Sequence, residues 1–208
     1  DSDLVNLTED MDFDGIEDDE DDCINVSGTS NQDRVGCPDT DGDGYSDPNA
    51  TWTVANGADA FINEITQWAD TDDDGYGDNQ AGVTPDACIS VVGTSTSDRH
   101  GCPDSDSDSF SDPDVLWTVA LGADACETVA GTSSQDRSGC PDDDSDGYSD
   151  PDPTGTNGPV WLVTDGADAF LGDLTQWADT DADGYGDNPP PATEGDSCAS
   201  ISGSSTLD

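Results

Sequence analysis

The stretch CPDTDGDGYSDP, residues 37–48, places four aspartates within nine residues, at positions 39, 41, 43 and 47. It contains no lysine or arginine. Carboxylates about 6 Å apart repel one another by roughly 0.7–3 kcal/mol per pair, for effective dielectric constants of about 80 down to about 20. A folded loop of this composition therefore needs a cation among its side chains.

The whole chain has the same excess of negative charge. Its 208 residues include 50 acidic and 3 basic ones, and the formal net charge is −47. Hydrophobic residues make up 31%, too few for apolar burial to offset this repulsion and the entropy lost on folding. Five tryptophans and seven cysteines nevertheless argue against a solvated acidic tail. Such a surface repels nucleic acids and anionic membranes, and no apolar run could cross a bilayer, so we expect neither as a partner.

The pattern D-x-D-x-D-G-x-x-D occurs in six copies, which we call the aspartate loops and number by position from their first aspartate. They begin at Asp10, Asp39, Asp70, Asp104, Asp142 and Asp179. In the loop at Asp104, Ser109 replaces the glycine, so we expect this site to be the weakest. A second element, D-x-C or D-x-F, follows each loop, in most copies after a spacer of variable length.

The chemistry of the aspartate loop indicates calcium. The aspartates at positions 1, 3, 5 and 9 direct oxygens at one point, and the residue at position 7 can add its backbone carbonyl. The glycine at position 6 permits the sharp turn that this needs. Calcium accepts about six to eight oxygen ligands at flexible angles, whereas magnesium requires strict octahedral geometry and retains its waters. Transition metals favour imidazole or thiolate, and the chain has one histidine.

An EF-hand is the competing interpretation of these loops. It needs a bidentate glutamate at position 12 and flanking helices. Position 12 is occupied by Asp21, Ala50, Ala81, Val115, Pro153 and Pro190. The EF-hand and the related dockerin loop are therefore excluded. Because Asp21 is also the aspartate of the first D-x-C element, the later spacers resemble insertions, after which the aspartate of D-x-C or D-x-F returns to complete the calcium shell.

Each predicted calcium site thus combines positions 1, 3, 5 and 9, the carbonyl of position 7 and the returning aspartate. The predicted ligands are Asp10, Asp12, Asp14, Ile16, Asp18 and Asp21; Asp39, Asp41, Asp43, Tyr45, Asp47 and Asp59; Asp70, Asp72, Asp74, Tyr76, Asp78 and Asp86; Asp104, Asp106, Asp108, Phe110, Asp112 and Asp124; Asp142, Asp144, Asp146, Tyr148, Asp150 and Asp168; and Asp179, Asp181, Asp183, Tyr185, Asp187 and Asp196.

The stretch DMDFDGIEDDEDDC, residues 10–23, resembles the thrombospondin type 3 repeat, whose core reads D-x-D-x-D-G-x-x-D-x-x-D-x-C. TQWADTDDDGYGD and TQWADTDADGYGD are similar to that family's segment with a glutamine shortly before the next loop. The resemblance implies an elongated, wire-like array wound around calcium ions, usually two per repeat, with disulfides between successive cysteines. It also implies an extracellular structural or adhesive role and no enzyme activity. Tryptophan-bearing spacers depart from the family pattern.

The cysteines follow the repeat. Three segments of similar sequence, residues 23–37, 88–102 and 126–140, begin and end with cysteine, and we call them the constant pieces. We expect each to form a disulfide between its own ends, Cys23 with Cys37, Cys88 with Cys102 and Cys126 with Cys140, which leaves Cys198 without a partner of this kind. Two shorter pieces carry Phe61 and Trp68, or Phe170 and Trp177, in the places of the cysteines. We infer that these aromatic pairs also tie the ends of their segments together. Metal binding by the cysteines is the alternative, but the C-x-x-C spacing is missing.

We predict an irregular fold with little regular secondary structure and a few short β pairings, stabilised by calcium and disulfides. No apolar period of a helix persists, and glycine, proline and serine interrupt the chain throughout. The predicted units are a first aspartate loop at 1–22, a unit with two loops at 23–87, a short unit at 88–125, a unit with two loops and a long spacer at 126–197, and the start of a truncated unit at 198–208.

Other residues leave alternatives open. Asn6, Asn25 and Asn49 begin glycosylation sequons, or chance matches to them. The three arginines either pair with nearby carboxylates, which we favour, or recruit a partner. The spacer tryptophans form either small local cores or contacts between molecules.

Disulfides indicate an oxidising, extracellular setting. We predict a calcium-rigidified structural protein, such as a stalk, surface-layer element or filament subunit, that associates with copies of itself or with further repeats. The alternative is a calcium-dependent adhesive module that recognises a partner such as a glycan. A third, weaker alternative is calcium buffering. No catalytic set recurs, so no enzyme is expected.

Overall fold

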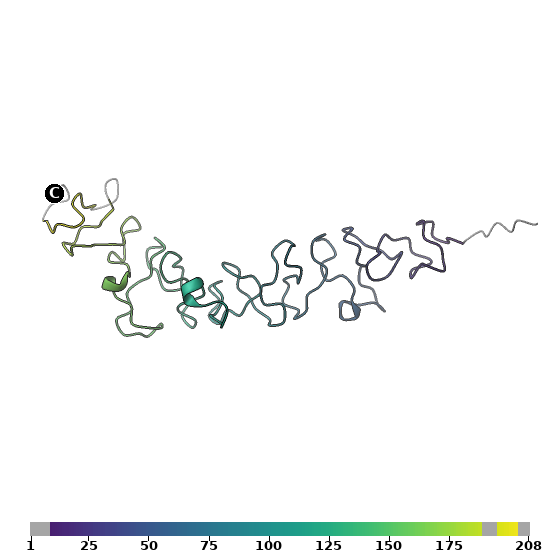
Figure 1. The fold of residues 1–208 in the computed structure, drawn as a ribbon, viewed down its shortest axis with the longest axis horizontal. Helices are drawn as coiled ribbons and strands as arrows, with labels where there is room; N and C mark the ends of the chain where they lie inside the picture. The colour runs from purple at the N-terminus through teal and green to yellow at the C-terminus, as the bar shows by residue number, and fades with distance from the viewer. Residues whose placement is uncertain (1–8, 189–194, 204–208) are drawn as a thin grey trace, which may run out of the picture. The chain divides into compact units, whose positions relative to one another are not determined.

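The computed structural model describes residues 9–188 and 195–203, and within these it has very little regular secondary structure (Figure 1). The only helices there are three 3-10 turns, η1 (Val54–Asn56), η2 (Val119–Leu121) and η3 (Val163–Asp165). Strand pairing is limited to isolated bridges, Gly77 with Pro85, Asp152 with Trp161 and Gly186 with Gly195. The predicted irregular fold is confirmed.

The three turns share one design. Each begins two residues after a spacer tryptophan and ends at a glycine in the left-handed region, as at Gly57, where φ is 106°. A Cβ atom added to this glycine would lie 3.6 Å from the Trp52 ring, so the turn folds back on the indole. The short apolar piece of each spacer is therefore a local structure around its tryptophan.

The chain divides into two compact units, residues 1–92 and 93–208, each of which contains three aspartate loops. The division falls inside the predicted short unit 88–125. The first unit holds the loops at Asp10, Asp39 and Asp70, and the second holds those at Asp104, Asp142 and Asp179.

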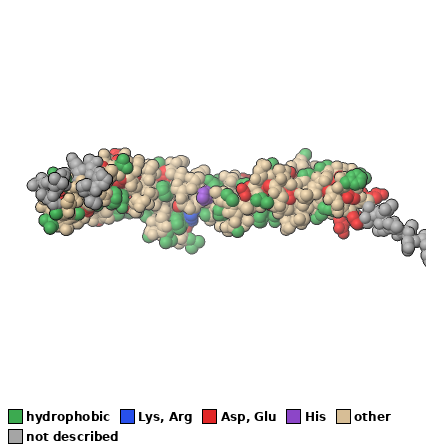
Figure 2. Space-filling model, turned by 90° about the horizontal axis from the view of Figure 1, so that it is seen from above, with side chains coloured by type: hydrophobic (Ala, Val, Ile, Leu, Met, Phe, Trp, Pro, Cys, Tyr) green, Lys and Arg blue, Asp and Glu red, His purple; other side chains and the backbone are tan. Residues whose placement is uncertain are grey.

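The interior of both units is small and polar. The buried hydrophobic residues are alanines and cysteines, whereas aspartates, serines and glutamines are buried beside them. Larger aliphatic side chains lie outside, and Val115 is 94% exposed. Figure 2 shows hydrophobic side chains scattered over one face of the surface. Apolar burial is therefore not what holds these units together.

Disulfides close the constant pieces. Cys23 is bonded to Cys37 and Cys126 to Cys140, with Cα atoms 5.1 Å apart in both pairs, as predicted. Cys88 and Cys102 are also disulfide-bonded, and Cys198 is free. The chain bends tightly inside each closed segment.

A buried serine, Ser30, Ser95 or Ser133, fixes this bend in each segment. The Ser30 hydroxyl accepts the N–H of Cys37 at 3.0 Å and donates to the carbonyl of Arg34. Gly28 permits the backbone to approach, because a Cβ atom there would fall 1.9 Å from the carbonyl carbon of Cys37. Ser133 and Cys140 repeat the arrangement in the second unit, at 3.0 Å.

The segments without cysteines are closed differently from the prediction. The sequence pattern pairs Phe61 with Trp68, but the Trp68 ring stacks on Tyr45, with centroids 4.9 Å apart. A backbone hydrogen bond from Ala60 N to Trp68 O, 3.0 Å long, joins the segment ends. In the second unit Trp177 stacks on Tyr148 in the same way, at 4.8 Å.

Candidate metal centres

Each aspartate loop is wound around its own carboxylates. In the loop at Asp39, that residue accepts the N–H groups of Gly42 and Gly44 at 2.8 and 3.0 Å. Asp41 Oδ1 accepts the N–H of Asp43 at 3.2 Å, and Asp43 Oδ1 accepts that of Tyr45 at 2.8 Å. These bonds use one oxygen of the third and fifth residues and leave the other oxygen for a ligand.

The carboxylates at positions 1, 3 and 5 converge as predicted. In each of five loops, these three side chains offer oxygens that lie within 4.8 Å of one another, and one further group of acidic or metal-ligating residues has the same closeness. The five groups are Asp10, Asp12 and Asp14; Asp39, Asp41 and Asp43; Asp70, Asp72 and Asp74; Asp104, Asp106 and Asp108; and Asp142, Asp144 and Asp146.

The returning aspartates are brought back to their own loops. Asp124 is fully buried, and a Cβ atom added to Gly139 would lie 2.3 Å from Asp124 Oδ1 and 2.9 Å from Asp108 Oδ2. Gly36 lies in the same way between Asp21 and Asp14. The neighbouring charges that act on Asp59, Asp86 and Asp168 likewise come from their own loops, so these spacers are insertions that leave the ends of the sites together.

Every returning aspartate has one oxygen fixed by the backbone. Asp124 Oδ1 accepts the N–H of Cys126, two residues later, at 2.7 Å. The equivalent bond, 2.6 to 2.7 Å long, is present at the other five returning aspartates. These are Asp21, Asp59, Asp86, Asp168 and Asp196. The D-x-C and D-x-F elements are therefore turns that orient a carboxylate.

The electrostatic environment of these aspartates opposes their charge. Burial, and then the charges of Asp108 and Asp106, raise the pKa of Asp124 to about 7. Burial and the charges of neighbouring loop carboxylates likewise raise the pKa values of Asp59, Asp86 and Asp168 to about 6. A positive charge at the centre of the loop would reverse this effect.

Unpartnered buried oxygens test whether a metal fits these residues. Among the described residues, buried carboxylate oxygens without a hydrogen-bond partner occur only at position 3, at position 5 and in the returning aspartates. Position 3 has one in all six loops: Asp12, Asp41, Asp72, Asp106, Asp144 and Asp181. The others belong to Asp43, Asp146, Asp59, Asp86, Asp124 and Asp196.

A buried carboxylate oxygen without a partner is costly, so native proteins pair it or use it to coordinate a metal. The donor set is entirely oxygen, without imidazole or thiolate, which suits a hard divalent cation. The residues therefore fit the predicted calcium.

Position 9 has a second role that the sequence reasoning missed. Asp47 accepts the N–H of Thr40 at 3.1 Å and the Thr40 hydroxyl at 2.6 Å. The same hydroxyl bond joins Thr71 to Asp78, Ser105 to Asp112 and Thr180 to Asp187. Asp18 and Asp150 accept only the backbone N–H of position 2 of their loops, which is Met11 or Asp143. Position 9 therefore closes the loop, and its spare lone pairs remain available to an ion.

Position 7 also does more than its prediction as a carbonyl ligand. In all six loops its N–H orients the carboxylate of position 5, as in the bonds made by Ile16, Phe110 and Tyr185 at 2.9 to 3.0 Å. Tyr76 makes the equivalent bond to Asp74 at 2.9 Å. In two loops the side chain of position 7 also stacks on a tryptophan, Tyr45 on Trp68 and Tyr148 on Trp177.

Backbone strain distinguishes the loop at Asp104. Ser109 has φ of 87°, in the region that favours glycine, which occupies position 6 in the other five loops. Ser107, at position 4, is also left-handed, with φ of 67°, but so is position 4 of every other loop. The strain at Ser109 is consistent with the expectation that the site is the weakest, which stays a prediction.

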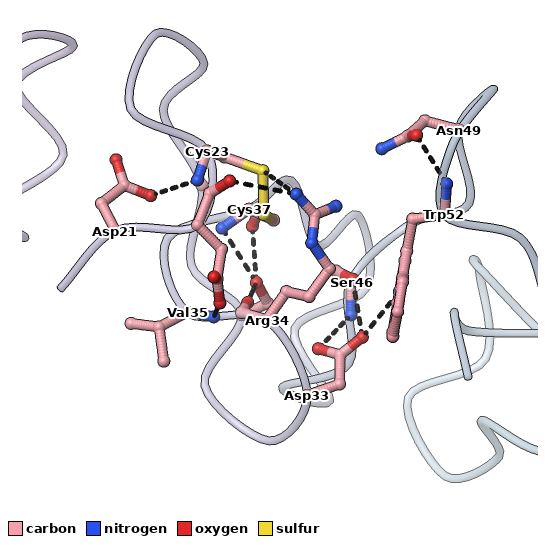
Figure 3. Close-up of a disulfide and its surroundings, with 12 residues drawn as sticks. Asp21, Cys23, Asp33, Arg34, Val35, Cys37, Ser46, Asn49 and Trp52 are labelled. Atoms are coloured by element: carbon pink, nitrogen blue, oxygen red, sulfur yellow. Dashed lines mark hydrogen bonds between the residues drawn. A yellow bond between two sulfur atoms is a disulfide. The ribbon is translucent and has the colours of Figure 1, made fainter. Parts of the chain in front are cut away.

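Three pairs of arginine and tryptophan lie beside the loops, and in two of them the tryptophan Nε1 also donates to an aspartate. Arg34 Cζ lies 5.6 Å from the centroid of the Trp52 ring, and its Nη2 donates to Cys23 Sγ at 3.2 Å (Figure 3). Trp52 Nε1 donates to Asp33, which also holds the buried Ser46 through bonds of 2.9 and 2.6 Å. These contacts join the disulfide segment to the spacer that follows the next aspartate loop.

The arginines thus correct part of the prediction. Arg99 forms an ion pair with Asp114 at 2.7 Å, as expected. All three arginines cover a tryptophan ring and donate to a backbone carbonyl. In the part of the chain that the structure describes, Arg34 and Arg137 form no ion pair. A sequence signal was present, since every spacer with a tryptophan follows a constant piece with arginine. Both spacers without a tryptophan follow a T-Q-W piece.

The two segments with the sequence T-Q-W, residues 66–68 and 175–177, have no arginine, and a buried glutamine joins each of them to the spacer after the next loop. Gln67 donates to the carbonyls of Asn79 and Val83 at 3.1 Å and accepts the N–H of Asn79 at 2.9 Å. Gln176 and Asn188 form the same pair, with bonds of 2.9 Å. The glutamine before each of these loops therefore forms hydrogen bonds to the backbone of the residues that follow the loop.

The predicted glycosylation sites have different outcomes. Asn25 and Asn49 are exposed, and Asn49 Oδ1 caps a turn by accepting the N–H groups of Thr51 and Trp52, both at 2.9 Å. Asn6 lies outside the described residues. Whether any of them carries a glycan stays a prediction.

Comparisons with known proteins add no family. No protein-family model matches the chain, and no curated protein matches it either. Within residues 9–188 and 195–203, no helix combines the length and hydrophobicity needed to span a bilayer. The resemblance to the thrombospondin type 3 repeat therefore rests on the residues of the loops.

Proposed function

We propose that this chain is an extracellular calcium-binding structural protein of the thrombospondin type 3 kind, in which bound calcium makes the repeats rigid. The observation that carries the proposal is the buried, unpartnered oxygen at position 3 of all six aspartate loops. One cation at each centre would pair several such oxygens at once. A stalk, a surface-layer element and a filament subunit all need this rigidity.

The residues of each loop would divide the work. Positions 1, 3 and 5 and the returning aspartate would hold the ion, and position 9 and the carbonyl of position 7 would complete its shell. Calcium supplies positive charge and accepts oxygens at flexible angles, which suits six loops that differ in detail. The interior lacks large apolar side chains in the described residues, so this charge balance would be the main stabilising interaction.

The proposal includes an oxidising location and no catalysis. Disulfides persist outside the reducing cytosol, and free calcium there is high enough to fill sites of modest affinity. A scaffold uses many copies of one site, whereas an enzyme usually carries one special constellation.

Removal of calcium tests this function. We expect a chelator to abolish the near-ultraviolet circular dichroism of the Trp68–Tyr45 and Trp177–Tyr148 stacks and to increase the radius of gyration in solution scattering. Calcium should restore both signals, whereas magnesium at the same concentration should restore them only in part. A chain that stays equally ordered and compact in chelator contradicts the proposal.

A second candidate is a calcium-dependent adhesive module, and a cavity of about 650 Å³ beside Trp68 favours it. Assembly distinguishes the two functions. A structural subunit should form rods or fibres in calcium, whereas an adhesive module should stay monomeric and bind its target only in calcium. Calcium buffering predicts uptake of many ions without any change in shape.

A further inference from the structure

The arginines of this chain are all used to cover tryptophans. Three spacer tryptophans each have an arginine guanidinium over the ring. The pairs are Arg34 with Trp52 at 5.6 Å, Arg99 with Trp117 at 5.5 Å and Arg137 with Trp161 at 5.4 Å. These are the only basic residues in the sequence apart from one histidine. The other two tryptophans, Trp68 and Trp177, therefore receive no guanidinium from their own chain.

Trp68 lies beside an open space in the first unit. The cavity of about 650 Å³ is lined by both rings of the Trp68–Tyr45 stack, by Val54 of η1 and by Asp70 and Asp73 of the following loop. The two rings are nearly parallel, with planes 5° apart. Aromatic rings and carboxylates that line one cavity attract a cation, because the ring faces and the carboxylates are both negative.

Asp73 gives this cavity a charge that the metal site does not need. It stands at position 4 of its loop, outside the predicted ligand sets, and its side chain is exposed. No described residue donates a hydrogen bond to its carboxylate. Its backbone is left-handed, with φ of 64°, as is that of position 4 in the other five loops.

The second unit contains a smaller cavity at the corresponding tryptophan. The identical sequence TQWADT, residues 66–71 and 175–180, surrounds both tryptophans, and Trp177 lines a cavity of about 130 Å³ together with Val163 of η3. At the position equivalent to Asp73 this unit has Ala182, which is also left-handed, with φ of 60°. The chain therefore provides its own comparison, with and without the carboxylate.

We propose that the cavity at Trp68 binds an arginine side chain of a partner protein, which lies against the Trp68–Tyr45 stack and pairs with Asp73. The three intramolecular pairs set the precedent, since this chain covers its other tryptophans with guanidinium groups. Guanidinium is planar and stacks on aromatic rings while it pairs with a carboxylate. The formal net charge of −47 is about twice what two calcium ions at each of six loops would supply, so the calcium-loaded chain still attracts a basic partner and repels an anionic one.

A pair of peptides tests this assignment. The full chain in saturating calcium and physiological salt is titrated with a blocked peptide that contains one arginine, and with the same peptide carrying neutral citrulline. The indole resonances of Trp68 and Trp177 are followed by NMR. We expect the arginine peptide to shift the Trp68 resonance saturably and to bind about fivefold or more tightly than the citrulline peptide. Equal binding of the two peptides would overturn the proposal.

Two variants locate the charge without disturbing the stack. Asp73→Asn should weaken arginine binding at Trp68 severalfold, and Ala182→Asp should strengthen it at Trp177. Both residues are exposed and left-handed, where asparagine and aspartate are tolerated. Unchanged binding in both variants argues against the assignment, as does a Trp68 shift produced by a neutral oligosaccharide and not by the arginine peptide.

The same samples separate this inference from the proposed function. Calcium uptake and near-ultraviolet circular dichroism should be unchanged in Asp73→Asn. A loss of arginine binding with normal calcium uptake supports the inference. A calcium-loaded chain that binds neither peptide refutes the inference and leaves the proposed function standing.

Discussion

Gly139 lies directly against the returning aspartate Asp124, because a Cβ atom on the glycine would fall 2.3 Å from Asp124 Oδ1. The glycine closes the disulfide segment, whereas the aspartate belongs to the preceding metal centre. Its φ of 74° is a second reason for glycine at this position. The disulfide segment and the metal centre are therefore in direct contact.

Gly139→Ala should damage the centre at Asp104. The added methyl group must displace Asp124, and the left-handed backbone adds strain, so we expect a loss of about 1–3 kcal/mol of stability in calcium. Calcium-dependent urea unfolding measures it. Gly172→Ala is the control, since nothing lies within 4 Å of its added Cβ atom. Equal stability of the two variants would contradict the contact.

Asp106→Asn should remove a calcium ion from the same centre. Both oxygens of Asp106 are buried without a hydrogen-bond partner of good geometry, so the substitution should act mainly on the ion. We expect the number of ions bound in calorimetry to fall, or the affinity at one site to drop by about tenfold or more. Glu127→Gln removes one charge from an exposed position nearby and should leave the titration unchanged.

Ser109→Gly should strengthen the loop at Asp104. Ser109 adopts φ of 87°, and glycine at that angle removes about 1 kcal/mol of strain. The reverse exchange, Gly75→Ser, places serine at φ of 95° where no atom lies within 4 Å, so it measures the backbone effect alone. Calcium affinity should rise in the first variant and fall in the second. Changes of the same sign in both would exclude this explanation.

Arg137→Lys should loosen the second unit. Arg137 is buried, lies 5.4 Å from the Trp161 centroid and donates to the carbonyl of Asn157 at 3.1 Å. Lysine keeps the charge but lacks the planar group that stacks, so we expect a loss of about 0.5–2 kcal/mol in thermal or urea unfolding. A variant as stable as the parent would show that charge alone is enough.

The metal-free chain should be more ordered in acid. Burial and neighbouring carboxylates raise the pKa of Asp124 from 3.8 to about 7 and that of Asp59 to about 6. A raised carboxylate pKa means that the folded form is favoured when the group is protonated. This stability is fully present below about pH 4 and is lost as the pH rises through about 6 to 7.

Circular dichroism in chelator should therefore gain intensity between about pH 8 and about pH 4. In calcium the same titration should show no such gain, because the cation already offsets the charges. A chelated chain that loses order on acidification contradicts the raised pKa values.

The centres were largely predictable because their residues are close in sequence. The spacing of Asp39, Asp41 and Asp43 brings three carboxylates together in one loop, and the register of D-x-F brings Asp59 back to it. The role of position 9 was not predictable from the aspartates alone, because its partners are the backbone N–H of position 2 and, in four loops, the hydroxyl of that residue, as at Thr40.

The contacts between segments were the least predictable. Trp68 stacks on Tyr45, which lies across another spacer, and no local pattern specifies that partner. Arg34 meets Trp52 across an intervening aspartate loop. In helices and strands, a periodic apolar face in the sequence indicates which side packs against another element. Irregular structure has no such period, so contacts between distant segments cannot be predicted from the local sequence.

The small, polar interior has a thermodynamic consequence. Unfolding exposes few large apolar side chains, and the heat-capacity increment that gives ordinary globular proteins a strongly curved stability profile arises mainly from such exposure. The stability of this chain should consequently change gently with temperature, and chilling should weaken it much less than a protein built on a hydrocarbon core.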